Sequence, residues 1–140
     1  MINVLPAYPS MFRGMTVQPA QRQIWPEMNE TDVAASIKAG YAFAACKGTA
    51  VLAIGGIARI DADRGIIWGV LADGIGADFP AMHAAVKRAI KSAPFVRIEA
   101  HILAEHEQGH RWIKTLGFEP EGLMRKFWRG KDFMLYSKVV

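Results

Sequence analysis

The chain has 140 residues, of which 51% are hydrophobic and 21% charged, with a formal net charge of +4. This composition excludes a disordered chain, and the length suits one hydrophobic core rather than two ordinary domains. No apolar run approaches the roughly 20 residues that a membrane-spanning helix needs, so we expect no membrane partner. One cysteine, Cys46, excludes an internal disulfide framework, and without a secretory signal we expect a cytoplasmic protein.

The first forty residues contain several prolines, which interrupt any long element. We predict a short strand over Ile2–Leu5 and short helical pieces at Ser10–Arg13 and Ala20–Trp25. A clearer helix runs from Thr31 to Ala39. Asn29 before it is a suitable N-cap, because its side chain can accept a backbone N–H of the first turn.

A β-meander follows, with strands predicted over Tyr41–Cys46, Thr49–Ile60 and Ile66–Leu71. The pair Gly55-Gly56 interrupts the second strand and suggests a bulge or a bend. The third strand is apolar on both faces, which predicts a central position in the sheet.

The remaining chain alternates helices and strands. A glycine-bearing loop leads into a helix from Pro80 to Lys91, where proline suits the first turn. In the next strand, Phe95–Leu103, polar Arg97, Glu99 and His101 alternate with apolar residues, which predicts one buried and one polar face. The last predicted elements are a helix, Glu107–Leu116, and the strands Leu123–Arg129 and Phe133–Val139.

The stretch His106-Glu107-Gln108-Gly109-His110 has the letters of the zinc peptidase motif H-E-x-x-H. That motif needs both histidines on one helical face. His106, however, follows the preceding strand closely, and Gly109 weakens a helix by about 1 kcal/mol relative to alanine. We therefore expect no metal site here, with adventitious binding through His101, His106 and His110 as a minor alternative.

The element order and two local signatures resemble the GNAT superfamily of acyl-coenzyme A dependent N-acetyltransferases. One signature is the loop Leu71-Ala72-Asp73-Gly74-Ile75-Gly76, which matches Arg/Gln-x-x-Gly-x-Gly/Ala except at Leu71. The other is Leu116-Gly117-Phe118 after the last helix. The resemblance implies an α/β fold over residues 1–140 as a single domain. It also implies a twisted, mixed, mostly antiparallel sheet of six or seven strands that splays open, with helices on both faces.

The same resemblance implies acetyl-coenzyme A as the cofactor and an unidentified amine as acceptor. Backbone amides of Gly74, Ile75, Gly76 and Ala77 would bind its pyrophosphate. Leu71 stands where the family has a basic or amide residue, and His106 stands at the family's asparagine position; both are counted with the cofactor site.

The catalytic groups depart from the family pattern. Ile113 stands where the family commonly has its general-acid tyrosine, and Tyr136 on the last strand is the most plausible replacement. No ionisable residue lies between Ile66 and Leu71, where a general-base glutamate is common. Glu99 and His101, on the polar face of the following strand, are the candidate bases.

A narrower resemblance is to a small GNAT-like family of virion or virion-assembly proteins of short-tailed bacteriophages. It is based on Leu52-Ala53-Ile54-Gly55-Gly56 and on Arg111–Gly117. It implies an alternative function: a catalytically degenerate phage protein, in the host cytoplasm or in the virion, that uses the fold to bind phage proteins. Oligomerisation stays open, and no motif indicates specific nucleic-acid binding.

Overall fold

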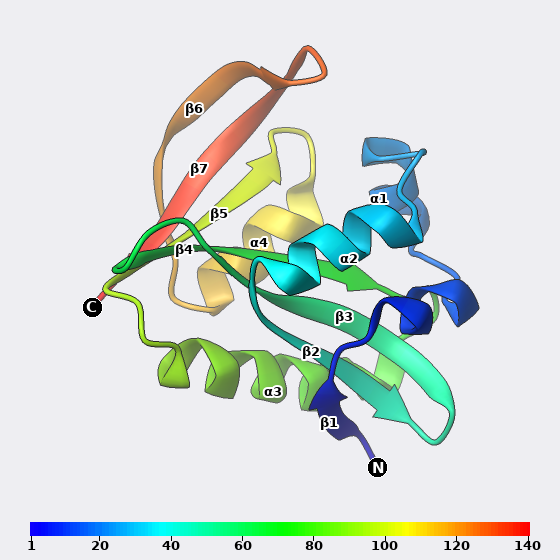
Figure 1. The fold of residues 1–140 in the computed structure, drawn as a ribbon. Coiled ribbons are helices and arrows are strands. Elements are labelled where there is room, and N and C mark those ends of the chain that lie inside the picture. The colour runs from blue at the N-terminus through cyan, green and yellow to red at the C-terminus, as the bar shows by residue number, and fades with distance from the viewer. The chain divides into compact units, whose positions relative to one another are not determined.

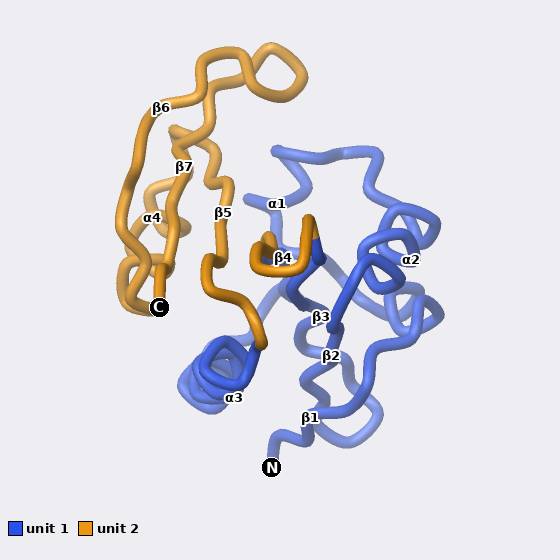
Figure 2. The backbone as a smooth tube through the Cα atoms, turned by 60° about the vertical axis from the view of Figure 1, so that its left-hand side comes forward, with its two compact units in different colours: residues 1–59, 67–93 blue, residues 60–66, 94–140 orange.

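The computed structural model describes all residues, 1–140, and shows an α/β fold with a mixed sheet of seven strands in the order β1-β2-β3-β4-β5-β7-β6 (Figure 1). The chain forms two compact units, and strand β4 (Arg64–Leu71) contributes to both (Figure 2). None of the helices is long and apolar enough to span a membrane. The expected fold class is confirmed, while the single domain over residues 1–140 stays a prediction.

The first unit contains residues 1–59 and 67–93. Its elements are β1 (Asn3–Pro6), the 3₁₀ helix η1 (Pro9–Gly14), α1 (Pro19–Ile24), α2 (Glu30–Lys38), β2 (Gly40–Lys47), β3 (Ala50–Arg59), the end of β4, the 3₁₀ helix η2 (Gly76–Asp78) and α3 (Phe79–Ser92). Strands β1, β2 and β3 pair antiparallel. Helices α2 and α3 lie on opposite sides of these strands (Figure 1), as expected.

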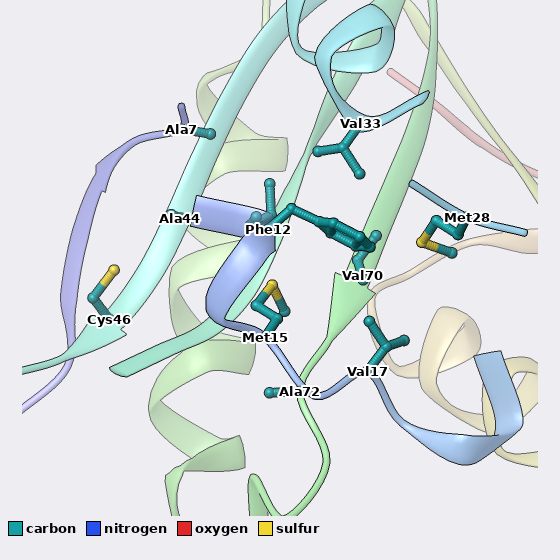
Figure 3. Close-up of a cluster of buried hydrophobic side chains, with 11 residues drawn as sticks. Ala7, Phe12, Met15, Val17, Met28, Val33, Ala44, Cys46, Val70 and Ala72 are labelled. Atoms are coloured by element: carbon teal, nitrogen blue, oxygen red, sulfur yellow. The ribbon is translucent and has the colours of Figure 1, made fainter. Parts of the chain in front are cut away.

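The core of this unit lies between η1, α2 and the sheet (Figure 3). Phe12 points from η1 toward Val70 of β4, and Val33 of α2 lies beside them. These three side chains are almost fully buried. Burying a side chain of this kind contributes roughly 1.5–3 kcal/mol, so the interrupted N-terminal region is held by packing rather than by long helices.

Helix α2 begins as the sequence predicts. The side chain of Asn29 accepts a hydrogen bond from the Asp32 amide, and Asp32 accepts one from the Asn29 amide. This reciprocal capping box satisfies two donors that would otherwise lack partners at the helix start.

Of the two predictions for Gly55-Gly56, a bulge or a bend, the bulge is wrong and the bend stays a prediction. The β2–β3 register runs through both glycines, and its shift lies instead between Ala45 and Cys46. The glycines serve a different purpose, because a Cβ on Gly56 would lie 2.0 Å from the Tyr41 carbonyl oxygen. Glycine is needed there for the close approach of two backbones.

The second unit contains residues 60–66 and 94–140. Its elements are the start of β4, β5 (Arg97–Leu103), α4 (Glu107–Thr115), β6 (Glu119–Trp128) and β7 (Lys131–Val139). Strands β5, β7 and β6 pair antiparallel. In contrast, β4 and β5 run parallel and pair only where Arg64–Ile66 meets Arg97–Glu99, although β5 stays paired with β7 to its end. The β4–β5 ladder ends at Ile66 and Glu99, and the expected splay of the sheet stays a prediction.

Two boundaries in this unit differ from the prediction. Strand β6 begins at Glu119 rather than Leu123 and includes Pro120, which an edge strand tolerates. Its hairpin with β7 turns through Arg129 and Gly130 alone, with φ of 52° and 72°. Two positive φ values are typical of the tight turn that matches the twist of paired strands.

Candidate functional site

The loop between β4 and α3 has the backbone shape of an anion-binding loop. Gly74 and Gly76 have φ of 72° and 43°, a region that favours glycine. Ile75 between them is buried and anchors the loop. Pro80 lies in the first turn of α3, where its missing N–H costs nothing. The loop therefore presents its backbone at the positive end of a 14-residue helix.

Not all of the predicted amides are free. The Gly74 amide donates to the Asp73 carboxylate at 3.0 Å, and the Asp78 amide donates to the Ile75 carbonyl at 2.9 Å. The amides of Ile75, Gly76 and Ala77 have no intramolecular acceptor. These three are consequently the donors best able to bind an external anion.

Two carboxylates lie in or beside this loop. Asp73 follows β4 directly, and its own amide donates to the Thr16 carbonyl at 2.7 Å. Asp78 precedes α3 and forms an ion pair with Lys47, with 3.2 Å between Nζ and Oδ1. Lys47 therefore compensates one of the two negative charges, whereas the charge of Asp73 would oppose a bound phosphate.

Leu71 brings no basic group to the loop, but its backbone is fully engaged. Its carbonyl accepts from the Gln18 amide at 2.9 Å. Its amide donates to Gln21 Oε1 at 2.7 Å, while Gln21 Nε2 donates to the Gly69 carbonyl at 2.8 Å. Sequence reasoning missed Gln21, because nothing in the local pattern of α1 points toward β4.

In the second unit, the β5–β7 register separates the candidate catalytic residues. Residues directly opposite each other in an antiparallel pair share a face. Tyr136 pairs with Ala100, whereas Glu99 pairs with Ser137 and His101 with Leu135. Since neighbouring residues of a strand point to opposite faces, Tyr136 lies on the face opposite to Glu99 and His101. The structure brings the two candidate bases together and does not bring Tyr136 to them.

Glu99 is part of an ionic network. Its carboxylate accepts from Arg97 at 2.7 Å and lies 3.6 Å from Arg64 Nε. Arg97 also binds Glu121 through two hydrogen bonds of 2.7 and 2.8 Å. The hydrogen bonds from Arg97, and then the one from the Ser137 hydroxyl, lower the pKa of Glu121 to about 2. The pKa of Arg97 is raised by its bonds to Glu121 and Glu99. Glu99 is thus held as an ion-pair partner.

His101 is the better placed of the two candidate bases. Its ring is half-buried and meets the ring of Phe127 edge-on, with 4.9 Å between centroids. Burial lowers the pKa of His101, against a smaller opposing effect from Glu99. The imidazole is therefore neutral near pH 7, which is the form that accepts a proton.

Tyr136 belongs to a buried polar arrangement under α4. His110 Nε2 lies 2.9 Å from the Ala104 carbonyl oxygen, and His110 Nδ1 lies 2.8 Å from the Tyr136 hydroxyl. A carbonyl can only accept, so Nε2 is the donor to Ala104, which leaves Nδ1 to accept from the Tyr136 hydroxyl. Burial raises the pKa of Tyr136, and Glu107 adds to the effect. The protonated hydroxyl of Tyr136 therefore donates its hydrogen bond to His110.

The H-E-x-x-H letters do not form a helical metal face. His106 lies at the N-cap of α4 with non-helical φ and ψ of −85° and 79°. Its ring packs over Gly109, where a Cβ would lie 2.4 Å from His106 Cδ2. Both ring nitrogens of His110 have protein partners, and no group of three metal-ligating side chains is gathered. Burial, and next the electrostatic effect of the neighbouring His110, lower the pKa of His106.

Solved structures with the same fold include acetyltransferases. Ard1 from Thermoplasma volcanium superimposes with a TM-score of 0.78 at 10% identity, over 99% of this chain and 97% of that chain. The ribosomal-protein-S18-alanine N-acetyltransferase from Escherichia coli gives 0.77 at 10% identity, over 100% and 94%. A GNAT-family acetyltransferase from Bacillus anthracis gives 0.72 at 15% identity, over 99% and 94%.

At these identities the likeness establishes the fold, which is that of the GNAT acetyltransferases. No protein-family model matches the sequence, and no curated protein matches it. The narrower resemblance to the bacteriophage family stays a prediction.

Proposed function

We propose that the protein binds acyl-coenzyme A and transfers its acetyl group to an amine. The observation that carries this proposal is the loop before α3. It combines two glycines at positive φ with the unpartnered amides of Ile75, Gly76 and Ala77, at the start of a long helix. This donor set suits the pyrophosphate of the cofactor. The buried side chain of Ile75 fixes the conformation of the loop. Gly74 contributes its positive φ, because its amide is already bound to Asp73. Leu71 and His106 remain proposed cofactor contacts.

His101 is the proposed general base, directly or through water. The cofactor supplies an activated thioester, so the protein needs to position the amine and remove a proton from its ammonium form. A neutral, half-buried imidazole suits this task. Glu99 beside it is engaged by arginines and is better suited to orienting the site than to accepting the proton.

Cofactor binding is tested by calorimetry with acetyl-coenzyme A. Asp73→Asn keeps an oxygen that can accept from the Gly74 amide and removes the nearby negative charge. We expect about three- to tenfold tighter binding, because a like charge no longer opposes the pyrophosphate. Asp61→Asn is the matched control, since Asp61 also accepts a loop amide, that of Asp63 at 2.9 Å, in a hairpin remote in sequence. No heat and no thermal shift at millimolar cofactor reject the proposal.

One observation favours a second function. The candidate acid Tyr136 lies on the opposite face from His101, and its hydroxyl donates a hydrogen bond to His110. That arrangement suits a protein that keeps the fold and binds partners, such as a phage assembly or structural protein, without acetyl transfer. Release of free coenzyme A thiol in the presence of a panel of amines separates the two functions. Tight cofactor binding without thiol release favours the non-catalytic role.

A further inference from the structure

Beyond Ile66, β4 forms no ladder pairs with β5, since the two strands pair only at Arg64–Ile66. Backbone groups along a strand point alternately to its two sides. The Ala72 amide donates to the Leu52 carbonyl of β3 at 2.8 Å. Gly69 and Leu71 therefore direct their N–H and C=O groups to the other edge. Leu71 is partly buried and Gly69 is exposed, so these groups are partly open to solvent and can pair with protein or ligand groups.

The segment before and within α1 provides these partners in two ways. Its backbone covers the end of the edge, because the Gln18 amide donates to the Leu71 carbonyl and Thr16 accepts from the Asp73 amide. A side chain covers the next part, because the carboxamide of Gln21 bonds both the Leu71 amide and the Gly69 carbonyl. Gln21 thus occupies the place of a peptide group in a neighbouring strand.

The backbone and side-chain hydrogen bonds to this edge of β4 differ in how easily they are broken. The backbone hydrogen bonds of Thr16 and Gln18 break only if the chain moves. The two hydrogen bonds of Gln21 break when its side chain rotates to another rotamer. Gly69 adds an independent indication of a ligand. It is exposed within the central strand, and a Cβ there would meet only one atom, the Ile54 carbonyl oxygen at 3.9 Å. A bare glycine in a strand often marks close approach by another chain or ligand.

We propose that Gln21 is a displaceable partner of β4 that sets the affinity for the amide-bearing arm of acyl-coenzyme A. This inference rests on the proposed function. The arm of the cofactor carries secondary amides, which can pair with the Leu71 amide and the Gly69 carbonyl as an added strand does. Gln21 must release both groups before the arm binds, so its two hydrogen bonds weaken the apparent affinity.

The test compares Gln21→Leu with the wild-type protein in calorimetry. Two hydrogen bonds no longer oppose the arm, so we expect about tenfold tighter binding of acetyl-coenzyme A. Adenosine 3′,5′-bisphosphate lacks the arm, and its affinity should not change. Gln23→Leu, at an exposed position of the same helix, is the matched control and should behave as wild type.

The outcomes distinguish the role of Gln21 from cofactor binding itself. Equal or weaker binding of acetyl-coenzyme A by Gln21→Leu overturns the inference while leaving the proposed function intact, and so does an equal gain with the armless nucleotide. No binding by the wild-type protein rejects the proposed function and this inference with it. If Gln21→Leu does not fold, NMR of the wild-type protein decides. The side-chain amide resonances of Gln21 should move when acetyl-coenzyme A binds, and bound cofactor with unmoved resonances overturns the inference.

Discussion

Replacing Tyr136 with phenylalanine separates a structural role from a catalytic one. Tyr136 is 3% exposed, and its hydroxyl makes one hydrogen bond, to His110 Nδ1 at 2.8 Å. Tyr136→Phe removes the oxygen, keeps the ring and leaves that nitrogen without a donor. We therefore expect a loss of stability with little direct effect on acetyl transfer.

The size of the loss follows from the burial of the pair. A buried acceptor left without its partner costs about 1–3 kcal/mol. Unfolding entropy of about 2.1 cal/mol/K per residue amounts to about 0.3 kcal/mol/K for 140 residues. A loss of about 2 kcal/mol should therefore lower the Tm by about 7 °C.

The assay is thermal unfolding followed by circular dichroism, together with thiol release measured well below the transition. Tyr8→Phe is the control, because Tyr8 is 59% exposed, and its Tm should stay within about 1 °C of wild type. The reasoning is refuted if Tyr136→Phe leaves the Tm unchanged. Loss of turnover at unchanged Tm would instead place the Tyr136 hydroxyl in contact with the reacting groups.

Three further changes have definite expected results. Gly56→Ala should cost about 3–5 kcal/mol in urea unfolding, because its Cβ would lie 2.0 Å from the Tyr41 carbonyl oxygen and the two strands must separate. Glu121→Gln should destabilise the protein at pH 7, and the difference should vanish toward pH 2. Contact with Arg97 holds the pKa of Glu121 near 2, below its ordinary 4.5, so its stabilisation is complete above pH 4.5 and lost below. If His101 is the base, its lowered pKa should place the midpoint of the acidic limb of the kcat–pH profile below pH 6.5, and His101→Gln should lower kcat about 100-fold.

Each of these has a control or a contrary result. Gly14→Ala matches Gly56→Ala, since a Cβ on Gly14 meets nothing within 4 Å, and it should unfold like wild type. A stability difference for Glu121→Gln that persists undiminished at pH 2 would contradict the ion-pair assignment. An unchanged kcat for His101→Gln would remove His101 as the base.

Much of the fold was predictable because its signals are local. The capping residue Asn29, the proline at the start of α3 and the alternation along β5 act over a few residues. Such signals place an element whatever surrounds it. The glycine loop belongs with them, since Gly74 and Gly76 do take the positive φ values that glycine favours.

The candidate site was predictable only in part, because it depends on pairings between distant residues. A shift of one residue in register moves every side chain of a strand to the other face. Nothing near Tyr136 in the sequence reveals that it pairs with Ala100 and binds His110. The same is true of Gly56, whose neighbours predict a bulge until the close approach of Tyr41 is seen.

The order of helices and strands, the caps and the glycine loop can be read from the amino-acid sequence, because they follow from the conformational preferences of adjacent residues. Which side chains share a face, and which backbone groups find partners, depends on packing between segments that are distant in the chain. The carboxamide of Gln21 reaches β4 across 48 and 50 positions of the chain. Contacts between residues so far apart in the sequence form only when the whole core packs, so no local sequence pattern predicts them.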